Sequence, residues 1–180
     1  MKDYFNAETA QKLGAQLGID GEEYAAWVAP RVEGLEILDR VTVFAQGLRE
    51  RLEGDYVEMV GGVVEKLGPE LAEGEGYFNH AFHLWPVSRF IELYGVDDPE
   101  VSLDAIEALT RVFTGEFAVR PFLDRYPALT MSRVHQWAGS DSHNVRRLAS
   151  EGIRPRLPWA KVYTPFVEDS SPIIPVLDRL

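Results

Sequence analysis

A motif that occurs twice constrains this chain more than any other feature of its sequence. Arg, any residue, an apolar residue, two small residues and Glu stand at 111–116 and again at 146–151, an offset of 35 residues. An Arg-Pro pair follows each copy, at 120–121 and at 154–155. A repeat of about 35 to 47 residues that holds two helices is typical of HEAT, armadillo and tetratricopeptide architectures. We therefore expect a HEAT-like α-solenoid, a right-handed stack of helix pairs.

The spacing of apolar residues supports a helical fold. Between 35 and 52, and again between 101 and 112, apolar residues recur every three or four positions, and no comparable stretch alternates with a period of two. Helix-start signals precede such runs: Asp20 with Glu23, Asp55 with Glu58, and Asp98 before Pro99. Tyr126-Pro127 and Ser171-Pro172 each predict a further helix start. The sequence predicts an all-α protein of about nine to eleven helices.

Length and composition limit the class of protein. With 180 residues the chain is long enough for one domain over 1–180, and without cysteine it has no disulfide framework or thiolate metal site. No apolar stretch approaches the roughly 18 residues that span a membrane, and the start lacks the pattern of a signal peptide. We therefore expect a soluble, cytoplasmic protein. Because the sequence stops partway through an expected helix, we interpret the domain as truncated at its C-terminal end.

Charge is distributed unevenly. The net charge is −11, which on average disfavours nucleic acid as a partner. Up to Gly115 there are 9 Lys and Arg against 22 Asp and Glu, whereas residues 116–180 carry 9 against 7. Residues 120–161 contain eight basic and three acidic residues. The second half of the chain therefore holds a local basic segment.

The motif places two glutamates in corresponding positions. Glu116 and Glu151 end the two copies, so stacked repeats would bring both carboxylates to one face, about 10 Å apart. The alternative is that each glutamate forms an ion pair with an arginine five residues before it or four after it. Spacing alone does not choose between paired catalytic carboxylates and ordinary ion pairs.

Cations and a tryptophan surround the second copy. Arginine forks bind phosphate oxygens in bidentate fashion, although arginines between repeats can also pair with carboxylates. Trp159 follows a proline-fixed loop and could stack on a sugar or a cationic base, or belong to the core between repeats. Trp27, Trp85 and Trp137 are interpreted as core residues. The basic candidates are Arg120, Arg146, Arg147, Arg154, Arg156 and Lys161.

Other kinds of site find little support in the sequence. His80 and His83 have a spacing compatible with zinc on a helix, but no third ligand is evident. The sequence has no glycine-rich phosphate loop, nucleophile elbow or Ser-His-Asp arrangement. We expect no metal and no nucleotide cofactor. A metal-dependent hydrolase that uses the two histidines is a remote alternative.

Two strings carry a resemblance to a known family. Residues 113–123 read FTGEFAVRPFL, and residues 144–160 read NVRRLASEGIRPRLPWA. Both resemble the AlkC branch of the bacterial DNA glycosylases of alkylation repair, and weaker similarity extends over residues 5–180. The second string is the more specific one, because it fixes two prolines, a tryptophan and four arginines in order.

The resemblance implies HEAT-like repeats curved around duplex DNA. It implies hydrolysis of the N-glycosidic bond of cationic bases such as 3-methyladenine and 3-methylcytosine, without conventional base flipping, by a monomer. By matching motif positions, Glu116 and Glu151 would stabilise the sugar cation or orient water, and Trp159 would pack against the lesion. The six basic residues would contact the DNA backbone. Relatives continue into further repeats that contribute a catalytic aspartate, so the resemblance puts turnover by this chain alone in doubt. A non-catalytic HEAT-like scaffold that binds DNA or a protein is the alternative.

Overall fold

The computed structural model describes all residues 1–180 and contains helices but no strands. The expectation of an all-α protein is confirmed. The helices are α1 (Ala7–Leu17), α2 (Gly21–Val28), α3 (Ile37–Arg51), α4 (Tyr56–Val64), α5 (Tyr77–His80), α6 (Trp85–Tyr94), α7 (Pro99–Thr110), α8 (Arg120–Arg125), α9 (Pro127–Trp137), α10 (His143–Glu151), α11 (Thr164–Glu168) and α12 (Ile174–Leu177). Three 3-10 helices cover Lys2–Tyr4, Ala29–Arg31 and Phe82–Leu84.

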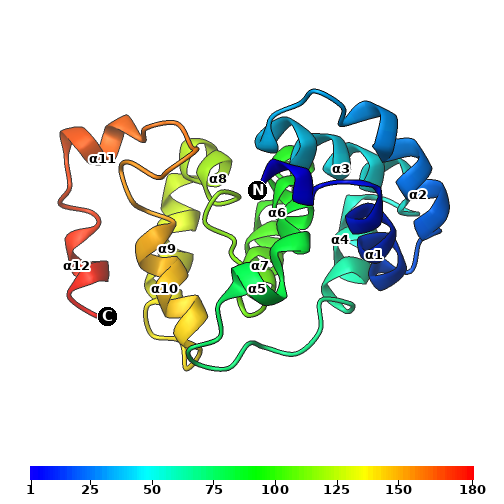
Figure 1. Cartoon of the computed structure of the whole chain (residues 1–180). Helices are drawn as coiled ribbons and strands as arrows, with labels where there is room; N and C mark the ends of the chain where they lie inside the picture. Colours follow the sequence, from blue (N-terminus) through cyan, green and yellow to red (C-terminus); the bar gives the residue numbers. More distant parts are fainter.

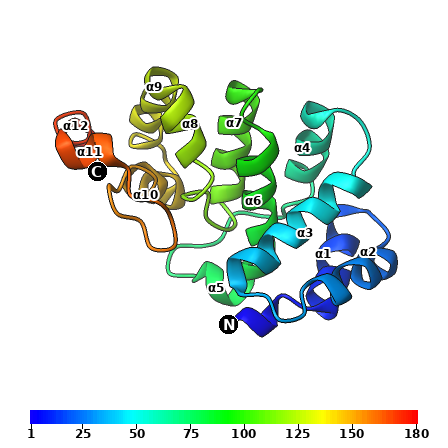
Figure 2. The same cartoon turned by 90° about the horizontal axis from the view of Figure 1, so that it is seen from above.

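The helices pack in successive pairs. Seen from above, α4, α7 and α9 form one row, and α3 and α6 lie beside the first two members of that row (Figure 2). Contacts follow the same order: α3 packs on α6, α4 on α7, and α7 on α9 and α10. The chain thus winds from α1 and α2 at one end to α11 and α12 at the other (Figure 1). This stacking of helix pairs confirms the expected helical-repeat fold.

Helix boundaries agree with most of the start signals. Asp55 and Glu58 form a complete capping box at the start of α4, and Asp20 caps α2 by accepting two backbone hydrogen bonds. Pro127 begins α9, as Tyr126-Pro127 predicts. After Ser171-Pro172, however, regular α-helix begins only at Ile174. The twelve α-helices exceed the expected nine to eleven because α5 and α12 have four residues each, too few to show a helical period.

One apolar cluster of 44 buried residues runs through the stack, from Phe5 to Val176. Trp85 and Trp137 are buried in it, which confirms their assignment to the core, and the Trp137 indole donates to Glu107 at 3.1 Å. Trp27 is only partly buried, with Arg31 and Arg51 over its ring. No helix is both long and apolar enough to cross a membrane.

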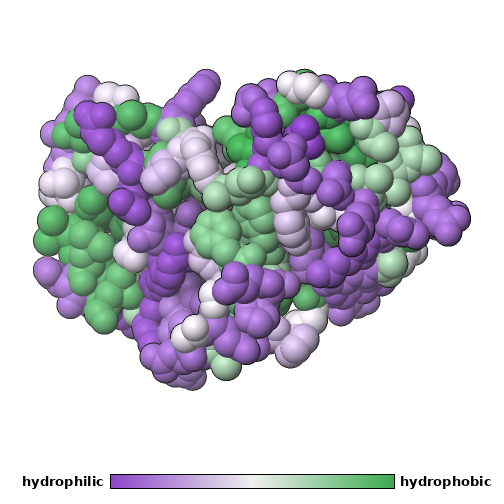
Figure 3. All heavy atoms as spheres, in the orientation of Figure 1, coloured by the Kyte–Doolittle hydropathy of each residue, from purple (hydrophilic) through white to green (hydrophobic).

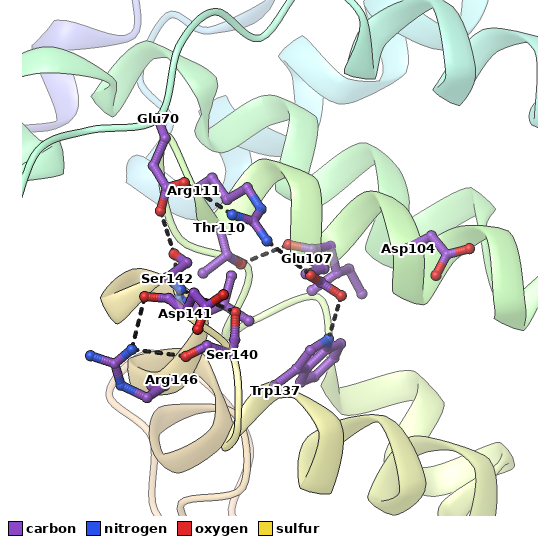
Figure 4. A network of polar contacts seen from close by, with 12 residues as sticks. Glu70, Asp104, Glu107, Thr110, Arg111, Trp137, Ser140, Asp141, Ser142 and Arg146 are labelled. Carbon is purple, nitrogen blue, oxygen red and sulfur yellow. Dashed lines mark hydrogen bonds and ion pairs between the residues drawn. The ribbon is translucent and has the colours of Figure 1, made fainter.

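A polar network ties the long connection between α4 and α5 to the second half of the stack (Figure 4). Glu70, in that connection, accepts hydrogen bonds from Ser142 and, at 3.0 Å, from Arg111. Arg111 also donates to Glu107 of α7 at 3.3 Å. The network therefore joins the connection to α7 and to the turn before α10, and α5 follows only a few residues later.

The network predicts a shifted titration of Glu70. Hydrogen bonds from Ser142 and then from Arg111 lower the pKa of Glu70 below its ordinary value. Because the folded-state pKa is lowered, the stabilising contribution is present above the unfolded pKa and is lost as the pH falls through the folded pKa. We expect Ser142→Ala to raise the pKa of Glu70 toward its ordinary value, measured by NMR titration of the side-chain carboxyl carbon.

Ser140→Ala is the matched control for this titration. Ser140 lies in the same turn, but its hydroxyl accepts from the Ser142 backbone and does not contact Glu70. The control should leave the pKa of Glu70 unchanged. An unchanged pKa in Ser142→Ala would show that the hydroxyl does not hold the carboxylate.

Candidate active site

A cavity of about 280 Å³ lies between α5, the turn after α7, helix α10 and the loop that follows α10. Figure 3 shows apolar surface in the middle of this face, over α5 and α6, next to a hydrophilic strip over α10. The cavity is lined by aromatic rings and by two carboxylates and two guanidinium groups. The charged residues are Glu116, Glu151, Arg147 and Arg154.

The two glutamates line the same cavity, as their repeat positions predict. Their local structures nevertheless differ. Glu151 is the last residue of α10, whereas Glu116 lies in the turn between α7 and α8. Thr114 and Gly115 precede Glu116 and have low helix propensity, whereas Ala149 and Ser150 continue α10 up to Glu151. The two copies of the motif therefore place their glutamates at the same cavity, although the glutamates lie in different secondary structures.

Glu116 is a buried carboxylate with two donors. Its side chain is 9% exposed and accepts from the Thr114 hydroxyl at 2.9 Å and from Arg147 Nη2 at 3.1 Å. The alternative pairing with Arg111 or Arg120 is wrong, because Arg111 binds Glu70 and Glu107 and neither arginine contacts Glu116. A buried charge is costly unless it is paired and hydrogen-bonded, and Arg147 of the next repeat provides the opposite charge for Glu116.

Glu151 is held differently. Its side chain is 25% exposed and pairs with Arg154, three residues later, at 2.8 Å. The alternative interpretation expected an arginine five residues before or four after the glutamate; Glu151 does form a local ion pair, but with an arginine three residues after it. The pair nevertheless lies at the cavity, so Glu151 is both locally compensated and available to a ligand.

Trp159 is at the surface of the cavity. Its indole is 53% exposed and stacks on Trp85, with ring centroids 5.5 Å apart and 25° between the planes. The assignment of Trp159 to the core is therefore wrong. Trp85 in turn stacks on Phe117 at 5.5 Å. Trp159 is also the one non-glycine residue with a left-handed backbone, at φ 62°, a conformation that concentrates at functional sites.

Aromatic residues that sequence reasoning missed complete the wall. The ring centroids of Tyr77 and Phe78 lie 4.7 Å apart, and the guanidinium carbon of Arg147 lies 5.2 Å from the Tyr77 centroid. Phe82 contacts both Phe78 and Trp85. Burial raises the pKa of the Tyr77 phenol, although Arg147 opposes the shift, so the phenol is neutral at pH 7. The density of aromatic residues between 77 and 85 was the one signal that could have indicated this wall.

The six basic candidates divide into three groups. Arg147 and Arg154 pair with the two glutamates, while Arg146 donates to the carbonyls of Ser140 and Asp141 and so stabilises the turn before α10. Arg120 donates to the carbonyl of Arg154. Only two of the six are exposed without a hydrogen bond or an ion pair: Arg156 and Lys161.

The two histidines do not share a site. His83 is buried, its Nε2 lies 2.7 Å from the side-chain oxygen of Gln16, and burial lowers its pKa to about 4. His80 is exposed at the end of α5. No group of three His, Cys, Asp or Glu side chains lies close enough to bind one ion.

One buried and one partly buried carboxylate beside a wall of aromatic faces can stabilise a cation by two means. The carboxylates interact with positive charge more strongly at a partly dry site than in water. The negative face of an indole or phenyl ring also attracts a cationic ligand. The cavity is therefore suited to a flat, positively charged ligand or to a reaction that develops positive charge.

Comparisons with known proteins agree with this arrangement. No family model matches the chain. The uncharacterized protein YhaZ of Bacillus subtilis is 36% identical over 151 residues, which is 84% of this chain and 39% of that protein. The Pseudomonas fluorescens alkylpurine DNA glycosylase AlkC, solved with DNA that contains an abasic site analog, superposes with a TM-score of 0.84 at 25% identity.

That superposition covers 99% of this chain and 49% of the AlkC chain. The chain thus spans about half the length of the solved protein and a smaller share of the Bacillus relative. The superposition of almost the whole helical stack identifies this chain as a protein with the AlkC-type helical-repeat fold.

Proposed function

We propose that this chain forms the base-excising part of a DNA glycosylase that acts on alkylated bases in duplex DNA. The observation that carries the proposal is the meeting of Glu116, from the turn after α7, with Glu151 and Trp159, from the end of α10 and the loop after it, at one cavity. The likeness to AlkC, whose solved structure holds DNA with an abasic site analog, supports DNA as the ligand.

The proposed reaction breaks the bond between C1′ of the deoxyribose and the base nitrogen. An alkylated cationic base departs with the bonding electrons and becomes neutral, so it needs no proton from the protein. Positive charge develops on the sugar, where Glu116 and Glu151 stabilise it, and water then adds to C1′ and loses a proton to the solvent by way of the adjacent carboxylates. Trp159 contributes an aromatic face that favours the cationic base before it leaves. Substrates of this class include 3-methyladenine and 3-methylcytosine, excised without conventional base flipping.

The basic residues around the cavity have different proposed roles. Arg147 and Arg154 hold the two carboxylates in place, as their ion pairs indicate. Arg156 and Lys161 have no protein partner and are suited to phosphate oxygens of the DNA strand at the cavity. Arg146 supports α10 from its first turn. The active protein acts as a monomer, without a metal or a nucleotide cofactor.

Glutamine variants of the two glutamates test the catalytic roles. We expect Glu116→Gln and Glu151→Gln each to slow base release from methylated duplex DNA by about 10²- to 10³-fold, because the charge that stabilises the sugar cation is lost. An amide still accepts a hydrogen bond, so circular dichroism and DNA affinity should change little. The measurement is single-turnover release of free methylated base by the 180-residue chain at low salt.

Glu168→Gln is the matched control, since Glu168 is an exposed glutamate of α11 outside the cavity. Release at the original rate by either cavity variant would remove that glutamate from the mechanism. If the chain binds the duplex but neither it nor a version extended through the further repeats of its relatives releases base, the scaffold interpretation is favoured, and the acidic first half then offers the surface for a protein partner.

Gly115 provides a second test, because the turn that carries Glu116 approaches α7 very closely. A Cβ atom at Gly115 would lie 2.6 Å from Cγ2 of Ile106 and 2.8 Å from the Thr110 hydroxyl oxygen. In Gly115→Ala the turn must move away from α7, which displaces the Glu116 carboxylate. We expect base release to fall by about 10²-fold, as for other misplaced catalytic groups, and the free energy of unfolding to fall by about 1–3 kcal/mol.

Gly61→Ala on α4 is the control for the glycine substitution, because no atom lies within 4 Å of the Cβ it would add. Alanine favours a helix over glycine, so the control should be as stable as the original or slightly more stable. Urea unfolding and single-turnover release measure both variants. Full activity of Gly115→Ala would contradict a fixed position for Glu116.

A further inference from the structure

Arg120 has contacts that differ from those of a residue that binds phosphate. It is the first residue of α8, and its Nη2 donates to the backbone carbonyl of Arg154. Its Nε and Nη1 atoms are buried and have no partner. Burial lowers the pKa of Arg120, which reflects the cost of keeping this cation away from water. Two of its three nitrogens are therefore shielded from any ligand and the third is occupied.

The segment above Arg120 is the loop that presents Trp159. The loop closes on itself, because the Tyr163 backbone N–H donates to the carbonyl of Pro155 at 2.8 Å. Arg120 touches both ends of this closed loop: the carbonyl of Arg154 on one side and the Tyr163 ring, 6.0 Å from the guanidinium carbon, on the other. The Tyr163 hydroxyl also donates to the carbonyl of Leu123 in α8, at 3.0 Å. The loop thus rests on α8 with the guanidinium beneath it.

The same contact reaches the second glutamate. The backbone carbonyl of Arg154 accepts a hydrogen bond from Arg120, and the Arg154 side chain donates one to Glu151 at 2.8 Å. Arg120 and Arg154 also hold the same place in the two Arg-Pro pairs, so one copy of the repeat supports the other. A shift of the Arg154 backbone would move both the ion pair of Glu151 and the start of the Trp159 loop.

We propose that Arg120 is a positioning residue that fixes the Trp159 loop and, through Arg154, the Glu151 carboxylate, and that it does not contact the DNA backbone. The hold on the loop is a property of the fold alone. Its consequence for base release rests on the proposed glycosylase function. The competing assignment is a phosphate contact from the neighbouring cavity of about 520 Å³, which Arg120 and Lys161 both line.

Tryptophan fluorescence tests the hold on the loop independently of any activity. In Arg120→Met the side chain still fills much of the space beneath the loop, but the contacts with Arg154 and Tyr163 are lost. We expect acrylamide quenching of the Trp159 signal, obtained by difference from Trp159→Phe backgrounds, to increase about twofold as the loop opens locally. Arg125→Met is the matched control, because Arg125 lies on α8 but is exposed and pairs with Asp97 away from the loop. It should leave quenching unchanged.

Salt dependence separates positioning from phosphate binding. The affinity for duplex DNA with an abasic site analog is measured over a range of salt concentrations. Loss of one phosphate contact reduces the slope of log affinity against log salt by about one. We expect this reduction for Arg156→Gln and not for Arg120→Met. In base release, Arg120→Met should lower kcat by about 10- to 100-fold with little change in KM, as expected when catalytic groups lose their alignment.

Arg120→Lys decides the matter if the methionine variant does not fold. Lysine keeps the charge but cannot reach Arg154 and Tyr163 with one planar fork, so we expect it to show the same increase in quenching and no gain in activity over methionine. Unchanged quenching in both variants, or a salt slope reduced as in Arg156→Gln, would overturn the proposal. If the original chain releases no base, the quenching experiment still decides whether Arg120 holds the loop, while base release by a chain extended through the further repeats decides the glycosylase function separately.

Discussion

The ion pair between the buried Glu116 and Arg147 is the interaction on which the site depends. A carboxylate that is 9% exposed requires compensation, and its cationic partner comes from α10, more than thirty residues later. Because Arg147 is 38% exposed and water can solvate it, loss of the pair should cost less than the about 3–5 kcal/mol typical of a fully buried pair. The contact can form only when α10 packs against α7. Stacking of the repeats and assembly of the cavity are therefore one event.

The aromatic wall depends on the same stacking. Phe117 follows α7, Trp85 begins α6 and Trp159 lies in the loop after α10, yet the three rings form one stack. Aromatic pairs contribute about 0.5–1.5 kcal/mol each beyond the area they bury. A left-handed backbone at a tryptophan costs about 1–3 kcal/mol, which the stack and the supporting loop contacts can offset. The exposed face of Trp159 is thus held in position by buried groups behind it.

Sequence patterns predicted the helical stack because burial imposes a helical period and repetition imposes an offset. They were less informative where a few local residues override the pattern, as after α7, which ends at Thr110 and leaves Glu116 in a turn rather than in a helix. The shortest helices, α5 and α12, left no period to detect. Trp159 could not be placed either, since a tryptophan at a repeat junction and one at a cavity rim have the same sequence signature until the loop geometry is known.

The arginines show a deeper limit of sequence reasoning. A guanidinium fork binds a carboxylate and a phosphate by the same geometry, so six cations in one segment predict an anion partner without saying which anion. In the folded chain Arg147 and Arg154 bind carboxylates, Arg120 and Arg146 bind backbone carbonyls, and only Arg156 and Lys161 remain unpaired. The number of phosphates that this surface can neutralise is correspondingly smaller than the charge count suggests.

The acidic first half of the chain does not prevent Arg156 and Lys161 from attracting phosphate groups. At physiological ionic strength the interaction between exposed charges falls off over about 8 Å, so most charges of α1 to α4 are screened from a strand at the second half of the stack. The balance that matters at the cavity is therefore local, and from 116 to 180 it is 9 basic against 7 acidic residues. With so few free cations, DNA binding by this segment should depend on shape and on the aromatic wall as much as on charge. Under the proposed function, a cationic base would then be selected by the carboxylates and rings of the cavity, while the surface around it contributes only weak, salt-sensitive attraction.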